Sequence, residues 1–184
     1  LEKWEDWPKN IILPEVALFI QNELSERQKH NESFPLHKYI HHGLSSQAML
    51  FNLVGPLLVQ NDFAPLKSAF EKHGIIWPKE NITPRFEQEN RSIFNEDSGQ
   101  PTSIDLVING QDNKKSLFIE SKLVEHEFGG CSVFAAGDCN GSNPAKNFRN
   151  CYLHHLGRKY WLLLEEYGFL DNPMWTGSIC PLSI

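Results

Sequence analysis

The sequence lacks the features that would carry a chain into a membrane, and it has no excess of positive charge. No apolar run approaches the roughly 18 residues that a spanning helix needs, and no basic-then-apolar leader opens the chain. We therefore expect a soluble, cytoplasmic protein. Seventeen Lys and Arg stand against 23 Asp and Glu, a formal net charge of −6. This balance argues against binding phosphates through overall charge, but it does not exclude a local basic patch.

Cysteine is also scarce. The chain holds four, Cys131, Cys139, Cys151 and Cys180. In the cytosol such thiols stay reduced, so a disulfide framework is not expected. None of the spacings gives the Cys-x-x-Cys pair that is typical of zinc knuckles. Two interpretations stay open: ordinary buried thiols, or a structural metal site such as one for Zn²⁺ on the four cysteines.

Enough apolar material is present for one core. Hydrophobic residues make up 40% of the 184 and aromatic residues 11%, which indicates a folded domain rather than a disordered chain. We expect a single domain over residues 1–184. Residues 1–40 form an N-terminal helical extension, and residues 41–184 form the main core with a C-terminal tail.

Helical signals dominate the first half of the chain. Pro14 favours the first turn of one helix, and Ser45 or Ser46 can cap a second. A third short helix is predicted from about Phe63 to Gly74, where glycine favours a helix end. The residues from Arg27 to Ser33 are polar and are expected to form a loop.

The hydrophobic period then changes to that of strands. The β-branched run 103–108 ends at Asn109-Gly110, a strong turn signal, and residues 116–123 supply a partner strand. Residues 82–91 also look extended. Helices followed by strands and then by another helix predict an α/β (α+β) fold.

Asp105 on one strand, with Glu120 and Lys122 on the next, is the most informative feature. Residues two apart on a strand share a face, so Glu120 and Lys122 project together. Both lie in apolar runs, where an unpaired charge is costly to bury. Carboxylate oxygens, with water and phosphate oxygens, suit Mg²⁺. The alternative is a structural salt bridge between Lys122 and either Asp105 or Glu120.

Ile104-Asp105, fourteen intervening residues and then Glu120-Ser121-Lys122 resemble the PD-(D/E)XK nuclease signature, although the literal Pro-Asp pair is absent. Residues 42–48, 101–105 and 119–123 resemble, more narrowly, a restriction-endonuclease family. The resemblance implies an αβββαβ core with helices flanking a central mixed sheet. It also implies Mg²⁺ or Mn²⁺ on Asp105, Glu120 and the Ser121 carbonyl, with Lys122 orienting the attacking water.

Families of this kind often add an upstream Glu or Gln to the site. Glu87, Glu89 and Gln47 are the candidates here. Some nucleases of the superfamily also carry an iron–sulfur cluster on four cysteines, though with a spacing that differs from the one in this chain.

A stripe of aromatic residues and leucines from Phe148 to Tyr167 predicts one further helix. His154 and Arg158 share its opposite face, and Lys146 and Lys159 lie nearby. These four residues are the candidate patch for contacting phosphates. The alternative is a solvated helix face.

The leading hypothesis is a Mg²⁺-dependent endonuclease that acts on DNA in a restriction or repair setting. Three alternatives stay open: an inactive nuclease fold that only binds nucleic acid, an interaction domain stabilised by metal on the cysteines, and a nuclease that acts on RNA. A homodimer is a further expectation, because cutting both strands of a palindrome favours two-fold symmetry.

Overall fold

The computed structural model describes residues 1–78, 81–97, 101–111, 115–124 and 130–183. These pack into two compact units. The first unit comprises Leu1–Glu89 and Ser103–Val124, and the second comprises Asn90–Thr102 and Glu125–Ile184. The expectation of one domain, with an N-terminal extension over residues 1–40, stays a prediction.

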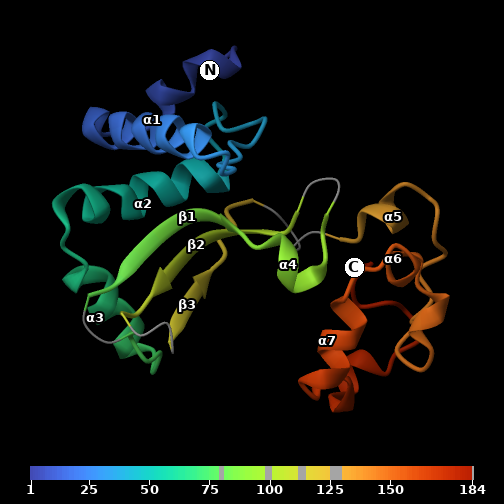
Figure 1. Cartoon of the computed structure of the whole chain (residues 1–184). Coiled ribbons are helices and arrows are strands. Elements are labelled where there is room, and N and C mark those ends of the chain that lie inside the picture. Colours follow the sequence, from blue (N-terminus) through green and yellow to red (C-terminus); the bar gives the residue numbers. More distant parts are fainter. Residues whose placement is uncertain (79–80, 98–100, 112–114, 125–129, 184) are drawn as a thin grey trace. The chain divides into compact units, whose positions relative to one another are not determined.

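Helices and a sheet in layers make up the first unit. Its elements are η1 (Trp4–Asn10), α1 (Pro14–Lys29), α2 (Ser46–Gln60), α3 (Ala64–Lys72), β1 (Thr83–Glu89), β2 (Ser103–Asn109) and β3 (Ser116–Ile119). Figure 1 shows α2 lying between α1 and the sheet. Ser45 caps α2, since its side chain accepts a hydrogen bond from the Ala48 N–H. Gly55 lets α1 come close, because a Cβ there would lie 2.3 Å from Val16.

The three strands form an antiparallel sheet in the order β1-β2-β3. Strand β2 occupies the centre, and alternate residues along it face opposite sides. Leu106 and Ile108 are fully buried in the core that the helices share. Asp105 therefore projects from the other face of β2. The α+β class is confirmed, and the described residues form a purely antiparallel sheet rather than a mixed one.

One apolar core holds the first unit together. Phe51 of α2 is fully buried against Phe34 and Phe86, with ring centroids 6.1 and 4.8 Å away. All members of the main buried cluster belong to this unit. Each such side chain contributes roughly 1.5–3 kcal/mol by leaving water, so the layered arrangement is where most of the hydrophobic stabilisation lies.

The second unit is made of short helical segments. They are α4 (Arg91–Phe94), α5 (Ser132–Ala135), η2 (Phe148–Asn150), α6 (Tyr152–His155), α7 (Tyr160–Glu166), η3 (Phe169–Asp171) and η4 (Pro173–Trp175). Ser142 and Ile179 form an isolated antiparallel bridge. Trp161 is the most deeply buried large side chain among the described residues of the second unit, and it packs edge to face on Trp175.

Two sequence expectations are wrong. The single helix predicted over 148–167 is broken into three segments. Cys151 is extended between η2 and α6, and Gly157, between α6 and α7, adopts a left-handed φ of 78° that stops a right-handed helix. The strand predicted over 116–123 ends at Ile119. The Ser121 N–H donates to the Asp105 carboxylate instead of to a neighbouring strand, and this turns the chain out of the ladder.

None of the helices in the described part of the chain is both long and apolar enough to cross a membrane.

Candidate active site

Three carboxylates lie in a row across the sheet of the first unit. Phe86 pairs with Leu106 and Gln88 with Ile104, so Glu87 and Asp105 lie between these two pairs. On the other side of β2, Leu106 pairs with Ile119, the last residue of β3, and Glu120 follows it directly. The negative charges of Asp105 and Glu120 both act on the Glu87 carboxyl, so the three groups are close together. The sheet register therefore gathers three acidic side chains that are distant in sequence.

Glu87 interrupts the β1–β2 pairing. Its φ of 49° lies in the left-handed region, which costs a residue other than glycine on the order of 1 kcal/mol or more. Arg27 holds this backbone: its guanidinium donates to the Phe86 carbonyl at 2.8 Å and to the Glu87 carbonyl at 3.3 Å. Its guanidinium also lies over the Phe34 ring. The loop expected from Arg27 to Ser33 therefore begins only after Lys29, and Arg27 is a buried part of α1.

The Glu87 carboxylate is buried and accepts two side-chain hydrogen bonds. The Gln47 amide on α2 donates to Oε1 at 2.6 Å, and the Ser103 hydroxyl donates to Oε2 at 2.9 Å. Gln47 is itself held, because its Oε1 accepts from the His37 N–H. Two of the three upstream candidates, Glu87 and Gln47, are therefore joined by a hydrogen bond. Glu89 lies at the end of β1, where it pairs with Ser103.

Charge and burial act together on Glu87. Burial raises the pKa of its carboxyl to about 7, hydrogen bonds from Gln47 and Ser103 oppose this shift, and the negative charges of Asp105 and Glu120 add to it. A carboxyl with such a pKa carries a proton for part of the time at neutral pH. This proton reduces the repulsion among three neighbouring acids.

Asp105 is fixed by the segment that follows β3. Its Oδ2 accepts from the Ser121 N–H at 2.7 Å. Ser121 is buried, and its hydroxyl donates to the Ser46 carbonyl at the start of α2. The central carboxylate is thereby tied through Ser121 to the helix that also presents Gln47.

Lys122 pairs with Glu120 at 2.9 Å. The salt bridge weighed as a structural alternative is thus present, but both side chains are partly exposed. Partly exposed ion pairs contribute about 0–1 kcal/mol to folding stability. This pair therefore adds little to the stability of the fold. The ammonium group nevertheless lies at the edge of the carboxylate row, where it can also reach a phosphate or a water.

The donor set fits a hard cation. In the described residues no group of three or more His, Cys, Asp or Glu side chains is already arranged to hold a metal ion. Mg²⁺ does not require one, because it usually takes one or two carboxylates and completes its octahedron with water and phosphate oxygens. Asp105 and Glu120 supply two such carboxylates, and that of Glu120 is exposed.

The four basic candidates for phosphate contact all lie in the second unit. Lys146 and Lys159 are exposed, whereas the Arg158 guanidinium donates to the Asn95 carbonyl. Nδ1 of His154 is buried and has no hydrogen-bond partner in the described part of the chain. His154 and Arg158 do not share a helix face as expected, since α6 ends at His155.

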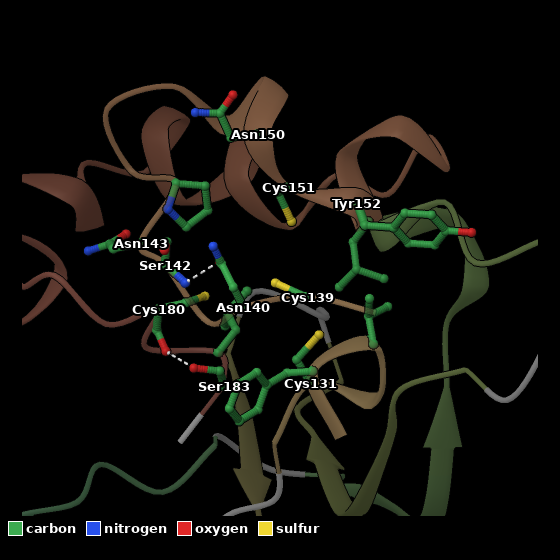
Figure 2. Close-up of a pocket in the computed structure, with 15 residues that line it drawn as sticks. Cys131, Cys139, Asn140, Ser142, Asn143, Asn150, Cys151, Tyr152, Cys180 and Ser183 are labelled. Carbon is green, nitrogen blue, oxygen red and sulfur yellow. Dashed lines mark hydrogen bonds between the residues drawn. The ribbon is translucent and has the colours of Figure 1, made fainter. Parts of the chain in front are cut away.

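All four cysteines line a single cavity of the second unit, shown in Figure 2. Each is a free thiol. Burial raises the pKa of the Cys180 thiol, a backbone hydrogen bond opposes this, and the nearness of Cys151, Cys131 and Cys139 raises the pKa further. The spacing in sequence did not reveal this convergence.

Sequence reasoning missed Ser103 and Arg27. Ser103 stands two residues before Asp105 on the same strand, so strand alternation could have placed it on the same face. Arg27 had no comparable signal, because its partners are backbone carbonyls some 60 positions away.

Comparison with known proteins gives one finding. The model of the family described as Restriction Endonuclease associating with ARP matches residues 2–176. No curated protein matches the chain, and no solved structure does.

Proposed function

We propose, since the chain belongs to the family of restriction endonucleases associating with ARP, that it hydrolyses phosphodiester bonds of DNA with Mg²⁺ held by Asp105 and Glu120. The family is of nuclease type. The observation that supports the finer statement is the row of carboxylates across β1, β2 and the end of β3, with Lys122 beside it. We place the protein in the PD-(D/E)XK superfamily on the same residues.

The side chains have separable roles in this proposal. Mg²⁺ or Mn²⁺ bound here would lower the pKa of a water and neutralise charge on the scissile phosphate. Asp105 and Glu120 supply the carboxylate oxygens, and the Ser121 carbonyl is a further candidate ligand. The Ser121 N–H keeps Asp105 in one orientation. Because Ser121 also bonds to α2, a cation bound by Asp105 would be placed relative to the core and not to a loose loop.

Lys122 supplies the positive charge. An ammonium group has three donors and no acceptor; Glu120 takes one of the donors. Its positive charge can orient a water and stabilise the charge that develops on the phosphate. Glu87, held by Gln47 and Ser103, would be a further candidate ligand in its deprotonated form.

Phosphate contacts by His154, Arg158, Lys146 and Lys159 are part of the proposal. Two of them, Lys146 and Lys159, are exposed and can contact the phosphates of a DNA backbone. With a net charge of −6, only a local patch can attract DNA. Double-strand cutting would further imply a pair of chains related by two-fold symmetry.

Cleavage of supercoiled plasmid tests the proposal. Wild-type protein should nick or linearise the plasmid with Mg²⁺ and not with EDTA. Asp105→Asn and Lys122→Ala should lower the rate by at least about a hundredfold, the scale on which one electrostatic catalytic group acts. The matched controls Asp138→Asn and Lys67→Ala, which change exposed residues of the same types, should keep wild-type rates.

Full activity of Asp105→Asn would contradict the assignment of the site. A wild-type protein inert on plasmid, on single-stranded DNA and on RNA, also with Mn²⁺, would contradict the enzyme itself and leave a nuclease fold that only binds. Cleavage of RNA alone would keep the site and change the substrate.

A further inference from the structure

Four cysteines lie close together in the second unit, and the proposed nuclease site uses none of them. They are Cys131, Cys139, Cys151 and Cys180. They line one cavity of about 350 Å³. Figure 2 shows their sulfur atoms pointing into the same space from separate segments. One thiol precedes α5, one follows it, one precedes α6, and one lies near the C-terminal end. Four separate segments contribute one thiol each, so the cluster depends on tertiary structure and not on a local motif.

Backbone hydrogen bonds hold these segments together around the cavity. The Cys131 N–H donates to the Leu182 carbonyl at 2.6 Å, and the Cys180 N–H donates to the Gly141 carbonyl at 2.7 Å. The Gly141 N–H in turn donates to the Cys139 sulfur at 3.4 Å. Hydrogen bonds of this kind orient the ligands of metal sites.

The second unit has only a small apolar core. The main buried apolar cluster lies wholly in the first unit. Among the described residues of the second unit, the buried hydrophobic side chains are Trp161 and Cys180. Its helical segments span three to seven residues, whereas isolated helices shorter than about 12–15 residues are marginal in water. Small units with such thin cores usually depend on disulfides or on a structural metal, and the cysteines here are free.

We propose that Cys131, Cys139, Cys151 and Cys180 bind one structural Zn²⁺ that closes the second unit. Four sulfur ligands are a set that tetrahedral Zn²⁺ prefers. Binding replaces the thiol protons, which pass to solvent, and no electron is transferred.

The four thiols do not yet form a coordination shell. In the described residues no group of three or more potential ligands is arranged to hold a metal. Rotation about the Cα–Cβ bonds has to bring the sulfurs to about 2.3 Å from the ion. The cavity provides the space for this, because the sulfurs already face into it. A zinc centre would therefore form by contraction of an existing cluster.

Metal content and thiol reactivity of the intact protein test the inference. Protein purified without chelator should contain about one zinc per chain, and its four thiols should react slowly with a disulfide reagent until the zinc is removed. Replacement by Co²⁺ should give the visible absorption of tetrahedral thiolate coordination. Cys151→Ser and Cys180→Ser should lose most of the bound metal. Ser142→Ala, which changes another lining residue, should keep it.

A cysteine variant could fail to fold, so wild-type protein provides a second measurement. Zinc-stripped protein should regain its unfolding temperature on addition of one equivalent of Zn²⁺, and Mg²⁺ should not replace it. Zinc-free protein with four rapidly reacting thiols and no response to added Zn²⁺ would overturn the inference. Iron with acid-labile sulfide would overturn it as well. Asp105→Asn should keep its zinc. The zinc measurement therefore tests this inference even if the nuclease proposal fails.

Discussion

The two units of the chain are stabilised by different means. In the first unit, α1, α2 and the sheet bury a continuous apolar core that contains fully buried residues such as Ile20, Phe51 and Leu106. In the second, short segments are joined by polar contacts. Buried Glu96 accepts from both the N–H and the hydroxyl of Thr102, each at 2.9 Å, and from the Tyr160 hydroxyl. The comparison predicts that core mutations and polar mutations have separate effects.

The same contrast applies to the candidate sites. The carboxylate row belongs to strands whose positions the core determines, and Arg27, Gln47 and Ser121 link it to the helices. Rigid elements of this kind can hold catalytic groups to within the tolerance that chemistry needs. The cysteine cluster, by contrast, lies where the chain has least regular structure, and there a ligand would supply the order.

Phe51→Ala should give the largest effect and test the core of the first unit. Removing this fully buried ring should lower the free energy of unfolding by about 3–5 kcal/mol through lost burial and a cavity. Chemical denaturation measures the loss, and hydrogen exchange should rise in residues 1–89 and 103–124 more than in 130–183.

The control for that experiment lies on the same helix. Leu53→Ala removes a side chain that is 64% exposed and should change stability little. Equal increases in hydrogen exchange in both units would show that they unfold together. This result would contradict separate stabilisation of the two units.

Glu87→Gln should give the next effect, and its sign depends on pH. In EDTA, the carboxyl has a pKa of about 7 when folded and near 4.5 when unfolded. Between these values the folded state binds more protons, so wild-type stability falls as pH rises through that window and is constant above it. Glu87→Gln lacks this slope and should be more stable than wild type at pH 8, by on the order of 2–3 kcal/mol.

Denaturant unfolding at a series of pH values provides the measurement. The exposed Glu2→Gln variant should keep the wild-type slope. A parallel pH dependence of wild type and Glu87→Gln would show that Glu87 does not retain its proton in the fold.

Tyr160→Phe should give the smallest effect and test the polar contacts of the second unit. It removes one donor to Glu96 while the two bonds from Thr102 remain. The expected loss is about 1–2 kcal/mol, as for a hydrogen bond to a charged group. Exchange should increase around residues 91–97 and 158–166. Tyr152→Phe, which changes an exposed ring, should leave exchange unchanged; equal effects of the two variants would contradict the role given to Glu96.

Sequence patterns predicted helices and strands correctly where the apolar residues pack into one core. The helix from Pro14, the cap at Ser45 and the strand around Asp105 are confirmed, because their apolar faces all meet in one core. The helix expected over 148–167 is wrong. Its apolar residues have helical spacing, but Gly157 adopts a left-handed φ that ends the helix. The main buried cluster among the described residues also contains none of them, so it does not hold them in one helix.

The sequence by itself determined the order of helices and strands in the first unit and the candidate set of Asp105, Glu120 and Lys122. Periodicity and alternation are local properties, so they can be read along the chain. Only the tertiary structure brought Gln47 to Glu87, placed Arg27 on the backbone of β1 and gathered the four cysteines around one cavity. These contacts join residues that are tens of positions apart, and they depend on how whole elements pack, which no local pattern encodes.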